Sequence, residues 1–90
     1  MPTVDVKQAV SIALKYSQSL LQDAANLALE EVELTEDQRY WLVTVGFTRP
    51  SERTNIKSIL GGAEPATRYY KIIKIDATTG DAVSMKIRTL

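Results

Sequence analysis

The segment RYWLVTVGFTR, residues 39–49, is the clearest indication of the fold of this chain. Bulky apolar side chains occupy every second position in it, and they are Trp41, Val43, Val45 and Phe47. The positions between them hold Tyr40, Leu42, Thr44 and Gly46. This period of two is typical of a β-strand, in which successive side chains point to opposite faces. We expect the first set to face a core and the second set to lie on the outer face of a sheet.

The segment before this strand has the period of an amphipathic helix over residues 5–25. Its apolar and small side chains recur three and four positions apart, and they are Val6, Ala9, Val10, Ala13, Ser17, Leu20, Leu21 and Ala24. Asp5 and Gln8 have the spacing of a capping pair, and Asn26 is a candidate left-handed stop. Because the middle of this stripe is small, the helix can lie close to a sheet.

Three further strands follow from the same reasoning. Residues 27–34 read as an edge strand whose open side is guarded by acids. Residues 68–76 and 81–89 alternate in the same way and read as a closing hairpin. The sequence therefore predicts an α+β domain over residues 1–90, with one N-terminal helix packed on a four-stranded antiparallel sheet in the order α-β-β-β-β.

The register of the closing hairpin depends on the loop around Gly80. A three-residue loop with a bulge explains the glycine, because it needs a left-handed residue there. That register places Ile73 and Ile75 on one face, and on the same face it places Val83, Met85 and Ile87. A four-residue loop would align Tyr70 and Ile72 with them instead, since a slip of one residue exchanges the faces. We favour the bulged loop.

The connection between the second and third strands, residues 50–67, is long for a compact domain. Ile56, Ile59 and Leu60 have helical spacing in it and are followed by two glycines, which indicates one short helical turn. We expect the rest of this loop to be mobile and available for binding.

The composition argues against an enzyme. The chain has no cysteine and no histidine, so thiolate metal sites and the commonest general base at neutral pH are excluded. Five acids lie between Glu30 and Asp37, but they lack the glycine-centred loop of a calcium site. Gly61 and Gly62 lack the spacing of a phosphate-binding loop. We expect no catalytic residue, no cofactor and no metal ion.

The charge is balanced overall but uneven along the chain. Eleven Lys and Arg offset eleven Asp and Glu. Residues 1–45 hold three basic and seven acidic residues, a net charge of −4, and residues 46–90 hold eight and four, a net charge of +4. Polar residues interrupt every apolar run, so we expect neither a signal peptide nor a membrane span, and a cytoplasmic protein if Met1 is the natural start.

The outer face of the predicted sheet is the candidate contact surface. If the tryptophan side of the strand points inward, four large side chains point outward from adjacent strands, and they are Tyr40, Leu42, Tyr70 and Ile72. Exposed patches of this kind usually mark contact surfaces. Lys74, Lys86 and Arg88 would share this face, which leaves a single-stranded nucleic-acid binder as a weaker alternative.

Three segments resemble PepSY-like domains: VKQAVSIAL at residues 6–14, WLVTVGF at residues 41–47, and IKIDATTGDAV at residues 73–83. The last matches a closing hairpin of the type V-x-I-D-x-x-T-G-x-V. The resemblance implies a cystatin-like shape and a non-catalytic inhibitory or regulatory role, and it carries no catalytic residue. Most such domains are extracytoplasmic, which differs from the location expected above.

The sequence thus favours a small non-catalytic binding or regulatory module with a protein partner. It would act through its outer sheet face, through residues 50–67, or through both. The alternatives are a structural homo-oligomer that pairs through the outer face, and a single-stranded nucleic-acid binder, which is not favoured.

Overall fold

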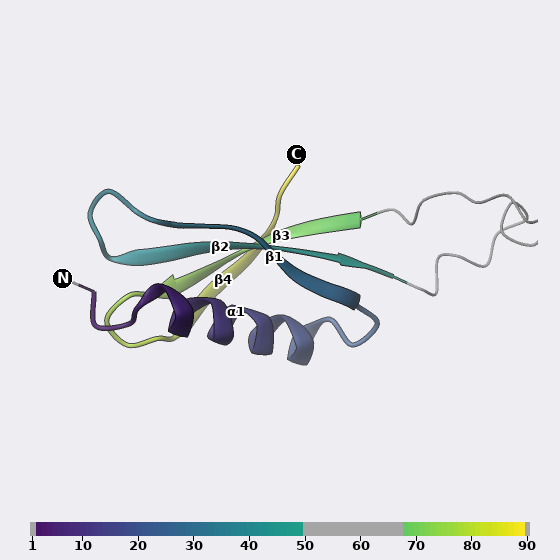
Figure 1. The fold of residues 1–90 in the computed structure, drawn as a ribbon, viewed down its shortest axis with the longest axis horizontal. Coiled ribbons are helices and arrows are strands. Elements are labelled where there is room, and N and C mark those ends of the chain that lie inside the picture. Colours follow the sequence, from purple (N-terminus) through teal and green to yellow (C-terminus); the bar gives the residue numbers. More distant parts are fainter. Residues whose placement is uncertain (1, 50–67, 90) are drawn as a thin grey trace, which may run out of the picture.

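The computed structural model describes residues 2–49 and 68–89, in which one helix lies along one face of a four-stranded antiparallel sheet (Figure 1). The elements are α1 (Val6–Leu20), β1 (Ala25–Leu34), β2 (Tyr40–Thr48), β3 (Arg68–Asp76) and β4 (Ala82–Ile87). The strand order in the sheet is β1-β2-β3-β4, so each strand pairs with its neighbour in sequence. The predicted α+β fold is confirmed. The predicted mobile loop and helical turn at 50–67 lie outside the described residues.

Helix α1 begins as the sequence indicates. Asp5 Oδ1 accepts a hydrogen bond from Gln8 N at 2.8 Å, and Gln8 Oε1 accepts one from Asp5 N at 2.9 Å. These two bonds form a capping box, which satisfies two backbone donors that the helix itself leaves unpaired.

The predicted end of the helix was wrong. Helix α1 stops at Leu20, five residues before the expected end at residue 25. Its last turn has no basic residue, and Asp23 follows it with a charge that the negative end of the helix dipole disfavours. Asn26 is left-handed as predicted, with φ of 56°, but it lies inside β1 rather than at the end of the helix.

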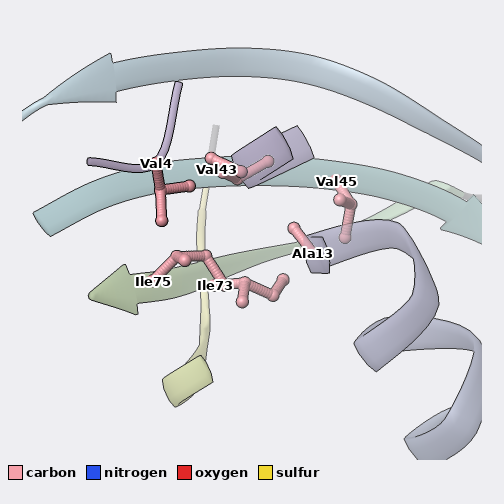
Figure 2. Close-up of a cluster of buried hydrophobic side chains, with 7 residues drawn as sticks. Val4, Ala13, Val43, Val45, Ile73 and Ile75 are labelled. Carbon is pink, nitrogen blue, oxygen red and sulfur yellow. The ribbon is translucent and has the colours of Figure 1, made fainter. Parts of the chain in front are cut away.

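The core lies between α1 and the inner face of the sheet, which we define as the face that carries Val43 and Ile73. Figure 2 shows side chains from the N-terminal segment, the helix, β2 and β3 pointing toward one another. The residues of this cluster are Val4, Ala9, Ala13, Val43, Val45, Ile73 and Ile75, and none of them is more than 8% exposed. The small residues Ala9 and Ala13 face the sheet in this cluster, which lets the helix lie close to it.

Trp41 lies on the inner face, as expected, and also fixes the start of the chain. Its Nε1 donates a hydrogen bond to the carbonyl oxygen of Val4 at 2.8 Å. The amide of Val4 in turn donates to the carbonyl oxygen of Ala77 at 2.9 Å. The N-terminal segment is therefore held beside the turn between β3 and β4, where Figure 1 shows it.

The closing hairpin combines parts of both predicted registers. Asp76 N donates to Asp81 O at 2.8 Å and Gly80 N donates to Asp76 O at 2.9 Å, so the loop has four residues rather than three. Gly80 is left-handed as predicted, with φ of 81°. A bulge at Val83 then shifts the register back, because Ile75 pairs with Ala82 while Lys74 pairs with Ser84.

The bulge decides which side chains of β4 face the core. Ile73 pairs with Met85, as the favoured register required. The expected inward position of Val83 was wrong, because Val83 is the extra residue of the bulge and is 53% exposed.

Within the described residues, no helix has the length and apolar character needed to cross a bilayer.

Candidate binding surface

The outer face of the sheet is the face turned away from α1, and it carries all four residues of the predicted contact surface. In β2, Tyr40 and Leu42 alternate with inward-facing Trp41 and Val43. Across the ladder Thr44 pairs with Ile72 and Gly46 pairs with Tyr70, so the β3 residues lie on the same face. The four residues are Tyr40, Leu42, Tyr70 and Ile72.

The four side chains do not form an open apolar patch. Each is half-buried, and none belongs to the large exposed hydrophobic residues of the described chain. Thr44, which follows Leu42 on this face of β2 and pairs with Ile72, is only 2% exposed. The expectation of an exposed patch was therefore too simple, because other side chains cover part of the outer face.

The first covering group is Arg88, which follows β4. Its Nη1 donates to Glu31 Oε1 at 2.8 Å and to Thr44 Oγ1 at 2.7 Å, and its Nη2 lies 3.4 Å from Glu31 Oε2. Glu31 belongs to β1, at the opposite edge of the sheet. The arginine side chain thus crosses β3 and reaches β2, where Glu31 meets it from β1, and it covers part of the outer face. The apolar stem of an arginine covers hydrophobic surface while its charge stays paired.

The second covering group lies over Gly46. Arg68 Nη2 donates to Glu30 Oε1 at 3.1 Å and to the carbonyl oxygen of Asn26 at 3.3 Å. A Cβ atom at Gly46 would lie 2.5 Å from Glu30 Oε1 and 2.8 Å from Arg68 Nη2. Glycine in the middle of this strand is therefore explained by the close approach of the ion pair to the backbone.

At the other end of the outer face, a lysine lies over a tyrosine. Lys74 Nζ is 4.2 Å from the centroid of the Tyr40 ring, which is the geometry of a cation–π contact. Leu42 pairs with Lys74 in the ladder, so the two residues are neighbours on the outer face. This part of the face remains apolar at its centre with a cation at its border.

Glu30 and Glu31 of β1 form the ion pairs with Arg68 and Arg88. The side-chain hydrogen bond from Arg88, together with its charge, lowers the pKa of Glu31 below its ordinary value of 4.5. Within the described residues, no three acidic side chains converge on a position where a cation would bind. Glu30 and Glu31 are therefore explained by their ion pairs with Arg68 and Arg88.

The carboxylates of the two turns also have structural partners. Asp76 accepts from the amides of Thr79 and Thr78, and these hydrogen bonds lower its pKa below 3.8. Asp37 accepts from the Thr35 hydroxyl and the Arg39 amide, which lowers its pKa in the same way. Turn residues of this type stabilise the loop that carries them.

A pocket opens at the end of the sheet where β4 stops short of β3. Its volume is about 490 Å³, and its lining residues are Arg49, Arg68, Tyr69, Tyr70, Lys71, Ile87, Arg88 and Thr89. Only Tyr70 belongs to the predicted contact surface. The sequence pattern does not predict this pocket, because the pocket depends on where β4 ends.

The arginine–glutamate pairs were also missed, but one signal for them was present. Gly46 interrupts an otherwise bulky apolar strand, and a glycine there indicates close approach by another group. The identity of the approaching group could not be predicted, since Glu30 and Arg68 are brought together only by the sheet.

Comparisons of the chain with models of known protein families, with curated proteins and with solved structures found no match.

Proposed function

We propose that this domain is a non-catalytic binding or regulatory module of the PepSY-like kind, which contacts a partner protein through its outer sheet face. One observation carries the proposal: Tyr40, Leu42, Tyr70 and Ile72 lie together on the face of the sheet that α1 does not cover. Half-buried aromatic and aliphatic side chains with charged groups at their border resemble the core and rim of a protein interface.

The charged groups on this face favour a protein partner over a nucleic acid. Arg88 and Arg68 are already held by Glu31 and Glu30, and Lys74 lies over the Tyr40 ring. A polyanion would have to compete with these contacts. It would also approach the acids of β1, which repel phosphate groups.

Self-association through the same face is the second candidate, and the charge distribution supports it. Glu30, Glu31 and Glu33 lie along one border of the outer face, in β1, whereas Lys86 and Arg88 lie at the other, in and after β4. A two-fold axis along the strands, placed between two facing sheets, sets β1 of each copy over β4 of the other. The symmetry repeats each contact twice, so opposite charges would meet at both rims, which favours association.

The test is the double substitution Leu42→Glu with Ile72→Glu, which places two charges on the outer face. The matched control is Val6→Glu with Leu29→Glu, which changes two exposed apolar residues elsewhere and adds the same charge. Circular dichroism should show that both double variants keep the fold. Proteins captured from a lysate by the wild type should also be captured by the control but not by the outer-face variant.

Sedimentation at several concentrations separates the two candidates. A concentration-dependent dimer that the outer-face variant loses and the control keeps would support self-association. If the outer-face variant captures the same proteins and sediments like the wild type, the outer face is not the contact surface and the proposal fails. Unfolding of the outer-face variant would place its side chains in the core and would also overturn it.

A further inference from the structure

The pocket beside β3 lies at a step in the edge of the sheet. Strand β3 has nine residues and β4 has six. Pairing between them runs as far as Lys71 with Ile87, and the amide of Arg88 adds a bond to the carbonyl oxygen of Tyr70 at 3.0 Å. Beyond that point the chain turns away from the sheet (Figure 1). The first two residues of β3 therefore lie past the ladder that β4 supplies.

The backbone at this step can pair with another strand. In an antiparallel ladder, every second residue turns its N–H and C=O toward the same neighbour. The carbonyl of Tyr70 turns toward the β4 side, so the backbone groups of Arg68 turn to that side as well. An extended peptide that continues the line of β4 would meet these groups, which is the geometry of strand addition.

The lining of the pocket is rich in cations, and their partners differ. Half of the eight lining residues are basic. Arg68 and Arg88 are paired with carboxylates at 3.1 Å and 2.8 Å, and Arg49 lies 3.9 Å from Asp23. Among residues 2–49 and 68–89, no carboxylate forms an ion pair with Lys71. Lys71 is therefore the basic side chain of this lining that no described carboxylate pairs with, and we take it as the charge that meets a ligand.

An apolar surface adjoins this charge. Ile87 pairs with Lys71 in the ladder, so the two side chains share the inner face, and Ile87 is 78% exposed. It is the most exposed large hydrophobic residue of the described chain. Tyr69 lies on the same face, because it pairs with inward-facing Phe47 and stacks on it with ring centroids 5.8 Å apart. A ligand with one anionic group and an apolar neighbour fits this combination.

We propose that the pocket binds a carboxylate carried by an extended peptide segment of another protein, with Lys71 as its counter-ion. The peptide backbone pairs with β3 at Arg68, where none of the strands in the described part of the chain pairs with β3 on the β4 side, and an apolar side chain of the peptide covers Ile87. The pocket already lies beside pairs in which arginines hold carboxylates, and the nearby acids of β1 disfavour a chain of phosphates. This site is separate from the central part of the outer face.

The experiment titrates three peptides into the ¹⁵N-labelled protein and follows backbone amide shifts. The peptides are acetyl-Thr-Val-Thr-Val with a free C-terminus, the same peptide with an amidated C-terminus, and the amidated peptide acetyl-Thr-Val-Thr-Asp. The first should shift the amides of Arg68–Lys71 and Ile87–Thr89, and the second should bind at least fivefold more weakly. Binding of the third would show that a side-chain carboxylate also serves.

Substitutions test whether Lys71 is the residue that binds the peptide carboxylate. Lys71→Gln should lower the affinity for the free-carboxylate peptide at least fivefold, to the affinity measured for the amidated peptide. Lys86→Gln is the matched control, because Lys86 does not line the pocket, and it should leave binding unchanged. Leu42→Glu with Ile72→Glu should also leave peptide binding unchanged, which separates this site from the proposed function.

Three results would overturn the inference. The first is equal affinity for the acid and amide peptides, and the second is unchanged affinity in Lys71→Gln. The third is an oligothymidylate that shifts the same amides at lower concentration than the peptide does. That last result would assign the pocket to single-stranded nucleic acid instead.

Discussion

Ile72 and Ile73 are consecutive residues of β3, yet they lie on opposite faces of the sheet and different groups shield them from water. Ile73 is fully buried against α1 and the neighbouring valines of β2. Ile72 is half-buried on the face that Arg88 crosses to reach Thr44 and Glu31. Apolar packing closes the inner face, whereas long charged side chains close much of the outer one.

This difference has a physical consequence. Apolar contacts do not depend on pH or salt in the moderate range, because no charge is involved. An arginine held by a carboxylate responds to both, since protonation removes one charge and salt screens the attraction. The inner face should therefore set the stability of the fold, and the outer face should tune which surface is open to a partner.

The largest expected effect compares the two isoleucines directly. Ile73→Ala should lower the free energy of unfolding by about 2–5 kcal/mol, because it leaves a cavity in the core. Ile72→Ala should cost only about 1 kcal/mol, since a half-buried side chain loses less on truncation. Urea denaturation of both variants measures the difference. Equal losses would show that the two faces contribute equally to the free energy of unfolding, which would contradict the difference described above.

A smaller effect concerns the hydrogen bond from Trp41 to Val4. Trp41→Phe keeps an aromatic ring on the inner face but removes the Nε1 donor, so we expect a loss of about 1 kcal/mol. Hydrogen exchange at the Val4 amide, which bonds to Ala77, should accelerate in the variant. Unchanged exchange at Val4 would mean that the tryptophan does not hold the N-terminal segment.

The contribution of the outer face to the stability of the fold should depend on pH. Arg88 lowers the pKa of Glu31, so their pairing stabilises the fold above the ordinary value of 4.5 and is lost as the pH falls through the lowered value. The melting temperature of Arg88→Gln should therefore lie below that of the wild type at neutral pH, and the gap should narrow below pH 4.5. Lys86→Gln serves as the control, with a gap that does not change in this range.

The smallest expected effect is at Gly46. In Gly46→Ala the new Cβ displaces Glu30 and Arg68, whose surface pairing is worth up to about 1 kcal/mol. Replacing glycine in a strand regains about 0.5–1 kcal/mol of backbone entropy. The free energy of unfolding should thus change by less than about 1 kcal/mol, while its dependence on salt decreases. A loss of several kcal/mol would show that the backbone, rather than the ion pair, occupies the space.

Local signals in the sequence predicted much of the fold. The bounds of β3 were predicted correctly, and the capping pair of Asp5 and Gln8 marked the start of α1. The end of α1 was predicted five residues too late, because the apolar period continues into Leu21 and Ala24 although the helix does not. Periodicity reports which residues are apolar and does not report where the chain leaves the helix.

The candidate site was predicted in its position but not in its covering. The alternation in β2 placed Tyr40 and Leu42 on the outer face, and the ladder added Ile72 and Tyr70. The crossing of Arg88 to Glu31 joins residues far apart in the chain, and only the completed sheet determines that distance. The role of the four outer-face residues Tyr40, Leu42, Tyr70 and Ile72 as a contact surface stays a prediction.

The small-residue stripe of α1 has a consequence for how the protein is made. The strands pair in chain order, so each hairpin can form as soon as its second strand has left the ribosome. Helix α1 is synthesised before the strands, but Ala9 and Ala13 share the core cluster with Ile73 and Ile75 of β3, which emerge only after β1 and β2. During translation the helix therefore has only part of its partner surface. The helix can therefore complete its packing only once β3 has been synthesised and has joined the sheet.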